Sequence, residues 1–72
     1  MSATVDARGL SCPQPVLMAV EKMQEMGAGD LLVLVDTDAS KENVSRAAEA
    51  KGWQVQDIRS EGEEYHISLE RK

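Results

Sequence analysis

The chain contains a single cysteine, Cys12, within the short sequence Cys12-Pro13-Gln14-Pro15. A proline suits the first position of a helix because its missing N–H would have no partner there. The residue before a proline is pushed toward extended geometry, which is the geometry of an N-cap. We therefore expect Cys12 to cap a helix that begins at Pro13. Because the helix dipole favours a nearby anion, the sequence predicts a reactive cysteine whose pKa is lowered.

The same motif limits how far the thiol is activated. Pro13 and Pro15 have no N–H, so only the amides of Gln14 and of Cys12 itself are expected to face a sulfur anion. An alternative is that Cys12 is a small buried hydrophobic residue and that the prolines merely start a helix. Neither structural role requires cysteine, since Ser or Asp caps a helix better and Ala or Val fills space better. We favour the reactive thiol.

The chain offers few other groups for catalysis. His66 is the only histidine, and as a general base it would form a Cys–His pair with Cys12. It fits more simply on the polar face of an alternating strand. One cysteine and one histidine supply too few ligands for a zinc site. We therefore expect no metal and no cofactor, and a carrier of a chemical group rather than a complete stand-alone enzyme.

The elements that must position the motif alternate along the chain. Patterns of apolar residues and turn residues predict strands at 3–7, 31–35, 53–58 and 65–69, and helices at 13–26 and 40–51. Gly27 and Gly52 end the helices, and a turn at 61–63 joins the last two strands. Right-handed crossovers place both helices on one face of a mixed four-stranded sheet. The prediction is a βαβαββ two-layer α+β sandwich that forms a single domain over residues 1–72.

Each predicted helix has an apolar face directed at the sheet. In the first helix this face comprises Val16, Leu17, Ala19, Val20, Met23 and Met26. In the second helix it comprises Val44, Ala47 and Ala48, and we expect Asp38 to be the N-cap. Leu10 and Met18 flank the motif and are expected to form an exposed apolar rim for docking.

Composition narrows the class of partner. The 72 residues include 13 acidic and 8 basic side chains, for a net charge of −5. This balance opposes binding to phosphate backbones, so we expect no direct contact with nucleic acid. No apolar stretch approaches the roughly 20 residues of a membrane span, and the first residues do not resemble a signal peptide. We expect a cytoplasmic protein with a reduced thiol. We also expect it to be a monomer that acts on partner proteins at its surface.

Residues 6–16 carry a recognisable pattern, Asp6-Ala7-Arg8-Gly9-Leu10-Ser11-Cys12-Pro13-Gln14-Pro15-Val16. This segment resembles the signature of the TusA/SirA/YedF family of small sulfur-carrier proteins. The later stretches 42–46 and 50–53 resemble the YedF-like branch more than TusA itself. One departure is Asp38-Ala39, where TusA-type sequences tend to have an Asp-Pro pair.

The resemblance implies that Cys12 carries sulfur as a persulfide. It implies a sulfur-donor protein such as a cysteine desulfurase and a sulfur-acceptor protein, in pathways such as tRNA thiolation, sulfur oxidation or, for YedF-like members, selenium metabolism. Gly9, Leu10, Pro13, Gln14 and Pro15 form and position the motif. Arg8 and Asp38 are candidates for contact with an anion or a partner, and Arg8 is equally well explained as a solvated turn residue.

A second hypothesis is a redox-responsive regulatory or protein-interaction module that uses the same cysteine. A redox sensor commonly has a resolving cysteine close to the reactive one. This chain has one cysteine only, so the carrier hypothesis ranks first.

Overall fold

The chain alternates strands and helices, and the computed structural model describes residues 2–10 and 13–72. The elements are, in order, β1 (Ser2–Asp6), α1 (Gln14–Met26), β2 (Gly29–Val35), α2 (Asp38–Ala50), β3 (Gln54–Glu61) and β4 (Glu64–Arg71). The predicted order of elements is confirmed.

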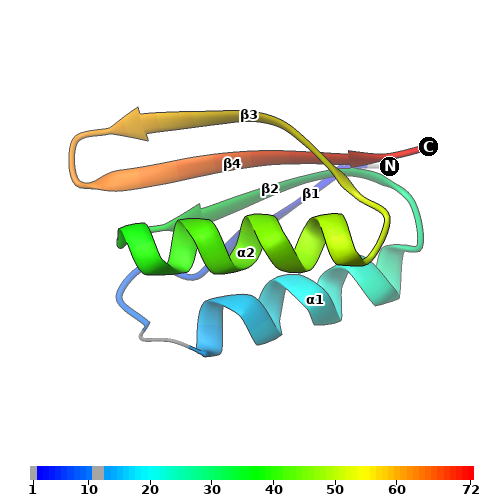
Figure 1. Cartoon of the computed structure of the whole chain (residues 1–72), viewed down its shortest axis with the longest axis horizontal. Helices are drawn as coiled ribbons and strands as arrows, with labels where there is room; N and C mark the ends of the chain where they lie inside the picture. The colour runs from blue at the N-terminus through cyan, green and yellow to red at the C-terminus, as the bar shows by residue number, and fades with distance from the viewer. Residues whose placement is uncertain (1, 11–12) are drawn as a thin grey trace.

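The four strands form one mixed sheet in the order β1-β2-β4-β3. β1 and β2 are parallel, whereas β4 is antiparallel to both β2 and β3. Both helices cover the same face of the sheet, and the opposite face is left uncovered by helices (Figure 1). The structure confirms the predicted α+β sandwich with two helices on one face.

The core lies between the sheet and the two helices. Alternate residues of the two central strands point into it, namely Leu31, Val33 and Val35 of β2 and Ile67 and Leu69 of β4. The helices contribute the buried residues Ala19, Met23, Val44 and Ala48. Because side chains alternate between the faces of a strand, the intervening residues of β2 and β4 lie on the uncovered face.

The start of α1 differs from the prediction by one residue. Pro13 occupies the N-cap position and the helix begins at Gln14, so Pro15 is the second helical residue. Pro15, Ala19 and Met23 are the buried residues of α1, spaced one turn apart. Leu17 lies midway between Pro15 and Ala19 in sequence, about 200° around the helix from each. It is 56% exposed, so its predicted place on the inner face is wrong.

The second helix begins earlier than predicted. Thr37, not Asp38, is the N-cap: its backbone is extended and its hydroxyl accepts a hydrogen bond from the N–H of Ser40 at 3.1 Å. Asp38 is the first helical residue. A hydroxyl that bonds the third amide is the usual N-cap arrangement. The adjacent Thr and Asp are both good caps, which explains the error of one position.

The predicted strands also shift at their ends. The last two strands are longer than predicted, and Trp53 precedes β3 instead of starting it. Its side chain is 2% exposed, and its N–H donates to the carbonyl of Ala48 at 2.9 Å. The connection after α2 is therefore fixed to the end of that helix before β3 begins.

Candidate functional site

The candidate site lies where the loop after β1 leads into α1. Cys12, the predicted reacting residue, and Ser11 lie outside the described residues. Because β1 and β2 are parallel and each is followed by a helix, both helices start at the same end of the sheet (Figure 1). The motif loop and the start of α2 are thus neighbours at that end.

The first turn of α1 has no side-chain cap. The side chain of Pro13 has no atom that could accept a hydrogen bond from the following amides. The backbone carbonyl of Pro13 accepts a hydrogen bond from the N–H of Leu17 at 3.0 Å. No acidic residue lies in this first turn. The partial positive charge at the helix N-terminus is therefore not offset by a carboxylate of the helix itself.

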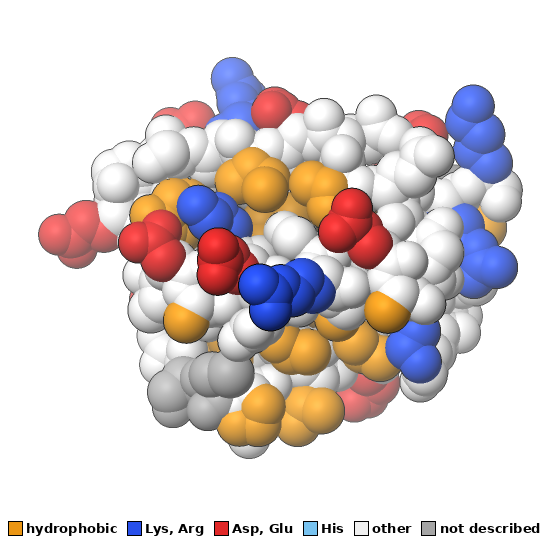
Figure 2. Space-filling view, viewed as in Figure 1, with side chains coloured by type: hydrophobic (Ala, Val, Ile, Leu, Met, Phe, Trp, Pro, Cys, Tyr) orange, Lys and Arg blue, Asp and Glu red, His pale blue; other side chains and the backbone are white. Residues whose placement is uncertain are grey.

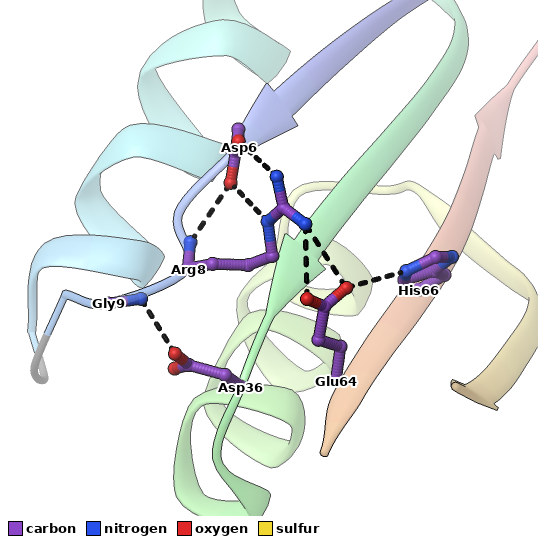
Figure 3. A network of polar contacts seen from close by, with 6 residues as sticks. All are labelled: Asp6, Arg8, Gly9, Asp36, Glu64 and His66. Carbon is purple, nitrogen blue, oxygen red and sulfur yellow. Dashed lines mark hydrogen bonds and ion pairs between the residues drawn. The ribbon is translucent and has the colours of Figure 1, made fainter. Parts of the chain in front are cut away.

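The loop before the motif is held by Arg8. Its Nε and Nη2 atoms each lie 2.8 Å from an oxygen of Asp6, at the end of β1. Its Nη1 atom donates to both oxygens of Glu64, at the start of β4, at 3.2 and 3.1 Å. Figure 3 shows the guanidinium between these two carboxylates. Arg8 therefore connects the loop to two different strands.

A second tie to the loop comes from the residue after β2. The N–H of Gly9 donates to Asp36 Oδ2 at 2.7 Å (Figure 3). Gly9 has a φ of 79°, in the left-handed region that favours glycine. The glycine of the motif thus permits a turn that brings its amide to the Asp36 carboxylate.

The charged groups of this network alter one another's pKa. Hydrogen bonds from Arg8 lower the pKa of Asp6 from 3.8 to about 2. The pKa of Glu64 is lowered by its hydrogen bond with His66 and then by those from Arg8. Asp6 and Glu64 in turn raise the pKa of Arg8. All three groups are fixed in their charged forms near neutral pH.

Asp38 belongs to a separate cluster at the start of α2. The hydroxyl of Tyr65 donates to Asp38 Oδ1 at 2.5 Å. Lys41 Nζ lies 3.6 Å from the same oxygen and 4.7 Å from the centre of the Tyr65 ring. The hydrogen bond from Tyr65 is the main cause of the lowered pKa of Asp38. The structure therefore joins Asp38 to β4 and does not bring it into the Arg8 network.

Apolar side chains are exposed near the motif. Leu10 is 37% exposed and Leu17 is 56% exposed, whereas Met18 is half-buried. Figure 2 shows apolar side chains over both the helices and the strands on the side in view, interrupted by charged ones. Leu10 fits the predicted apolar rim, and Leu17, which was predicted to face the core, is more exposed than Met18.

His66 lies on β4 beside the Arg8 network. Its Nε2 atom is 3.3 Å from Glu64 Oε1 (Figure 3). Over residues 2–10 and 13–72, no group of three or more His, Cys, Asp or Glu side chains is placed to hold a metal ion. Within the same residues, none of the helices is long and apolar enough to cross a membrane.

The sequence missed three residues of this region, namely Asp36, Glu64 and Tyr65. Glu64 is 56 residues from Arg8 in the chain, and nothing in the local pattern of either segment indicates the contact. The parallel pairing of β1 with β2 would have placed Asp36 beside the loop, since Asp6 at the end of β1 pairs with Leu34, one residue before the end of β2.

The fold and sequence of this chain match known proteins. The model of the family described as Sulfurtransferase TusA matches residues 3–71. The chain belongs to the TusA family. In this TusA-family chain the family match includes the whole motif, the Arg8 network and both helices.

Three relatives illustrate the similarity. Sulfur carrier protein TusA of Allochromatium vinosum is 29% identical over 68 residues, which are 93% of this chain and 90% of that protein. Sulfur carrier protein TusA of Pseudomonas entomophila is 47% identical over 38 residues, 53% of this chain and about half (48%) of that protein's length. The SirA-like protein from Desulfitobacterium hafniense has a solved structure with a TM-score of 0.86, at 33% identity over 97% of this chain and 96% of that one.

Proposed function

We propose that this protein is a sulfur carrier that accepts sulfur as a persulfide on Cys12 and passes it to an acceptor protein. The match of the Sulfurtransferase TusA family to residues 3–71 carries this proposal. The chemistry of the chain supports it, since Cys12 is the only thiol. A second thiol nearby would release the sulfur by forming a disulfide.

The proposed transfer conserves atoms and charge. The thiolate of Cys12 attacks the terminal sulfur of a persulfide on the donor, as in thiol–disulfide exchange. A new S–S bond forms on Cys12, the S–S bond of the donor breaks, and the donor cysteine leaves as a thiolate. An acceptor thiolate then attacks the terminal sulfur on Cys12 and regenerates the free thiol. No external oxidant or reductant is consumed.

The proposed partners are proteins. A cysteine desulfurase is the proposed donor, because it forms a persulfide of the kind that the reaction needs. The exposed Leu10 and Leu17 side chains supply apolar area for docking beside the motif. The reaction requires a reduced Cys12, so we propose that the protein works in a reducing compartment such as the cytoplasm. We also propose that it works as a monomer.

Intact mass spectrometry tests the proposal. The reduced protein is incubated with a cysteine desulfurase and cysteine, and wild type is compared with Cys12→Ser. We expect wild type to gain about 32 Da, removable by a thiol reductant, and the variant to gain nothing. Thr37→Ala, which changes the start of the other helix, is the matched control and should load normally.

Two results would contradict the carrier proposal. One is an equal mass gain in Cys12→Ser, which would place the sulfur elsewhere. The other is the absence of an adduct in wild type together with a thiol that alkylating reagents reach only after denaturation. The second result would instead support a buried cysteine in an interaction module.

A further inference from the structure

The loop that leads to Cys12 is held by three carboxylates, two of them in strands and one directly after a strand. Asp6 ends β1, Asp36 follows β2 and Glu64 begins β4. Arg8 accounts for the contacts with two of these strands, and Figure 3 shows its side chain reaching from the loop to Glu64. The sequence made Arg8 a candidate for contact with an anion or a partner, and it indicated no contact of this arginine within the fold.

We propose that Arg8 is a positioning residue for Cys12, which fixes the path of the preceding loop by binding Asp6 and Glu64 at the same time. The inference rests on the proposed function of Cys12 as the reacting thiol. It deepens that proposal by naming the groups that hold the thiol-bearing segment in place.

The geometry requires an arginine. Nε and Nη2 face the two oxygens of Asp6 side by side, which is the paired arrangement that a planar guanidinium forms with a carboxylate. Nη1 remains free for Glu64 on the other side. A lysine keeps the charge but has a single ammonium group, so it cannot reproduce this double arrangement.

The network is better suited to local order than to global stability. The side chains of Arg8, Asp6 and Glu64 are 41%, 54% and 36% exposed, so water and salt weaken the attraction between them. Exposed ion pairs usually contribute little to folding. The backbone they hold includes Gly9, which has no side chain to anchor it. Loss of Arg8 should therefore loosen the loop and leave the domain folded.

Such loosening matters for a transfer between two proteins. A displacement of about 1 Å of a reacting group can slow a reaction by about 100-fold. Cys12 follows Arg8 by four residues, and this short segment ends at Pro13, where α1 is anchored through the buried Pro15. Fixing the loop at Arg8 therefore restrains the segment from its other end.

The test compares Arg8→Lys and Glu64→Gln with the control Glu63→Gln. The rate of Cys12 alkylation by iodoacetamide is measured against pH, which gives an apparent pKa for the thiol without any donor. Glu63→Gln removes the same charge as Glu64→Gln one residue away, and within the described part of the chain Glu63 makes no hydrogen bond or ion pair. Loss of the fluorescence of the buried Trp53 monitors folding in each variant.

We expect Arg8→Lys and Glu64→Gln both to raise the apparent pKa of Cys12 toward the ordinary value of a thiol, because the loop that leads to the thiol loses its restraint. Loading by the desulfurase should slow about fivefold in both. Electrostatics alone predicts otherwise: Arg8→Lys would match wild type, and Glu64→Gln would lower the pKa as Glu63→Gln does.

The outcomes separate this inference from the proposed function. An unchanged apparent pKa in Arg8→Lys, or a lowered one in Glu64→Gln, overturns the positioning role whatever the donor does. If both pKa values rise as expected but wild type never gains sulfur, the carrier proposal fails and the positioning of the thiol by Arg8 stands.

Discussion

The two helices of this domain start in different ways. Both have 13 residues, both follow parallel strands and both begin at the same end of the sheet. α2 is capped by the hydroxyl of Thr37, and Asp38 supplies a carboxylate in its first turn. α1 begins after Pro13 with neither a side-chain cap nor a first-turn carboxylate.

This difference separates a structural helix start from one suited to chemistry. At α2, the amide of Ser40 is satisfied by Thr37, and the Ser40 side chain is buried. At α1, the preceding loop is held by the side chain of Arg8 and by the hydrogen bond from Gly9 to Asp36, which follows β2. No carboxylate in the first turn of α1 compensates the helix dipole. Rigidity is thus supplied from outside the turn that would act on a thiolate.

The largest expected effect concerns the start of α1. Cys12→Ser should abolish sulfur loading completely while lowering the thermal unfolding midpoint by no more than about 4 °C, because the proposed role of Cys12 is chemical and the substitution exchanges only sulfur for oxygen. Mass spectrometry and thermal unfolding measure the two quantities on the same sample. A large fall in the midpoint would show that residue 12 has a structural role as well, and the contrast between the helix starts would be lost.

The start of α2 should respond in the opposite way. Thr37→Ala removes the cap and should destabilise the domain by about 1 kcal/mol, which lowers the midpoint by roughly 4–8 °C in a domain of this size. The loading rate should not change.

Ser45→Ala is the matched control for the cap. It removes a hydroxyl that bonds the carbonyl of Lys41 inside the same helix, and such bonds do little for helix stability. Equal losses in the two variants would mean that Thr37 has no special role as a cap.

A smaller effect is expected from Tyr65→Phe. This substitution removes the hydroxyl that donates a hydrogen bond to Asp38 and keeps the aromatic ring. The pKa of Asp38 should rise toward its ordinary value, because that hydrogen bond is the main cause of its depression. Carboxyl chemical shifts followed by NMR as a function of pH would measure this change. Glu64, whose pKa depends on His66 and Arg8, is the internal reference and should titrate as in wild type.

The smallest effect is a loss of stability in acid. The pKa of Asp6 falls from 3.8 to about 2 in the folded protein, so its contribution is complete above about pH 4 and is lost as the pH falls toward 2. Asp6→Asn should show a shallower decline of the unfolding midpoint over this range. Parallel curves for the variant and wild type would indicate that Arg8 does not hold Asp6 in solution.

The strands, the helices and their arrangement could be predicted from the sequence, because each strand and helix has its own local pattern of apolar and turn residues. The prediction failed at boundaries, where neighbouring residues such as Thr37 and Asp38 are both good caps and only the hydrogen bond to Ser40 decides between them. It also placed Leu17 in the core, because apolar character does not reveal which side of α1 faces the sheet.

The candidate site was predictable only in part. The motif around Cys12 is a continuous segment, so its residue types could be interpreted directly. The contact between Arg8 and Glu64 depends on the sheet order, which brings β4 next to β2. The pattern of apolar residues around Arg8 and around Glu64 does not indicate that these two residues are in contact.

The central position of β4 also has a consequence for biosynthesis. β4 is the last strand to be made, yet it lies between β2 and β3 and pairs with both. A nascent chain that has reached α2 can form only the β1–β2 pair, with one side of β2 unpaired. The sheet closes only after residues up to Arg71 have left the ribosome, and Glu64 arrives with them. The loop before Cys12 therefore acquires its full set of contacts only when synthesis of the fold is complete.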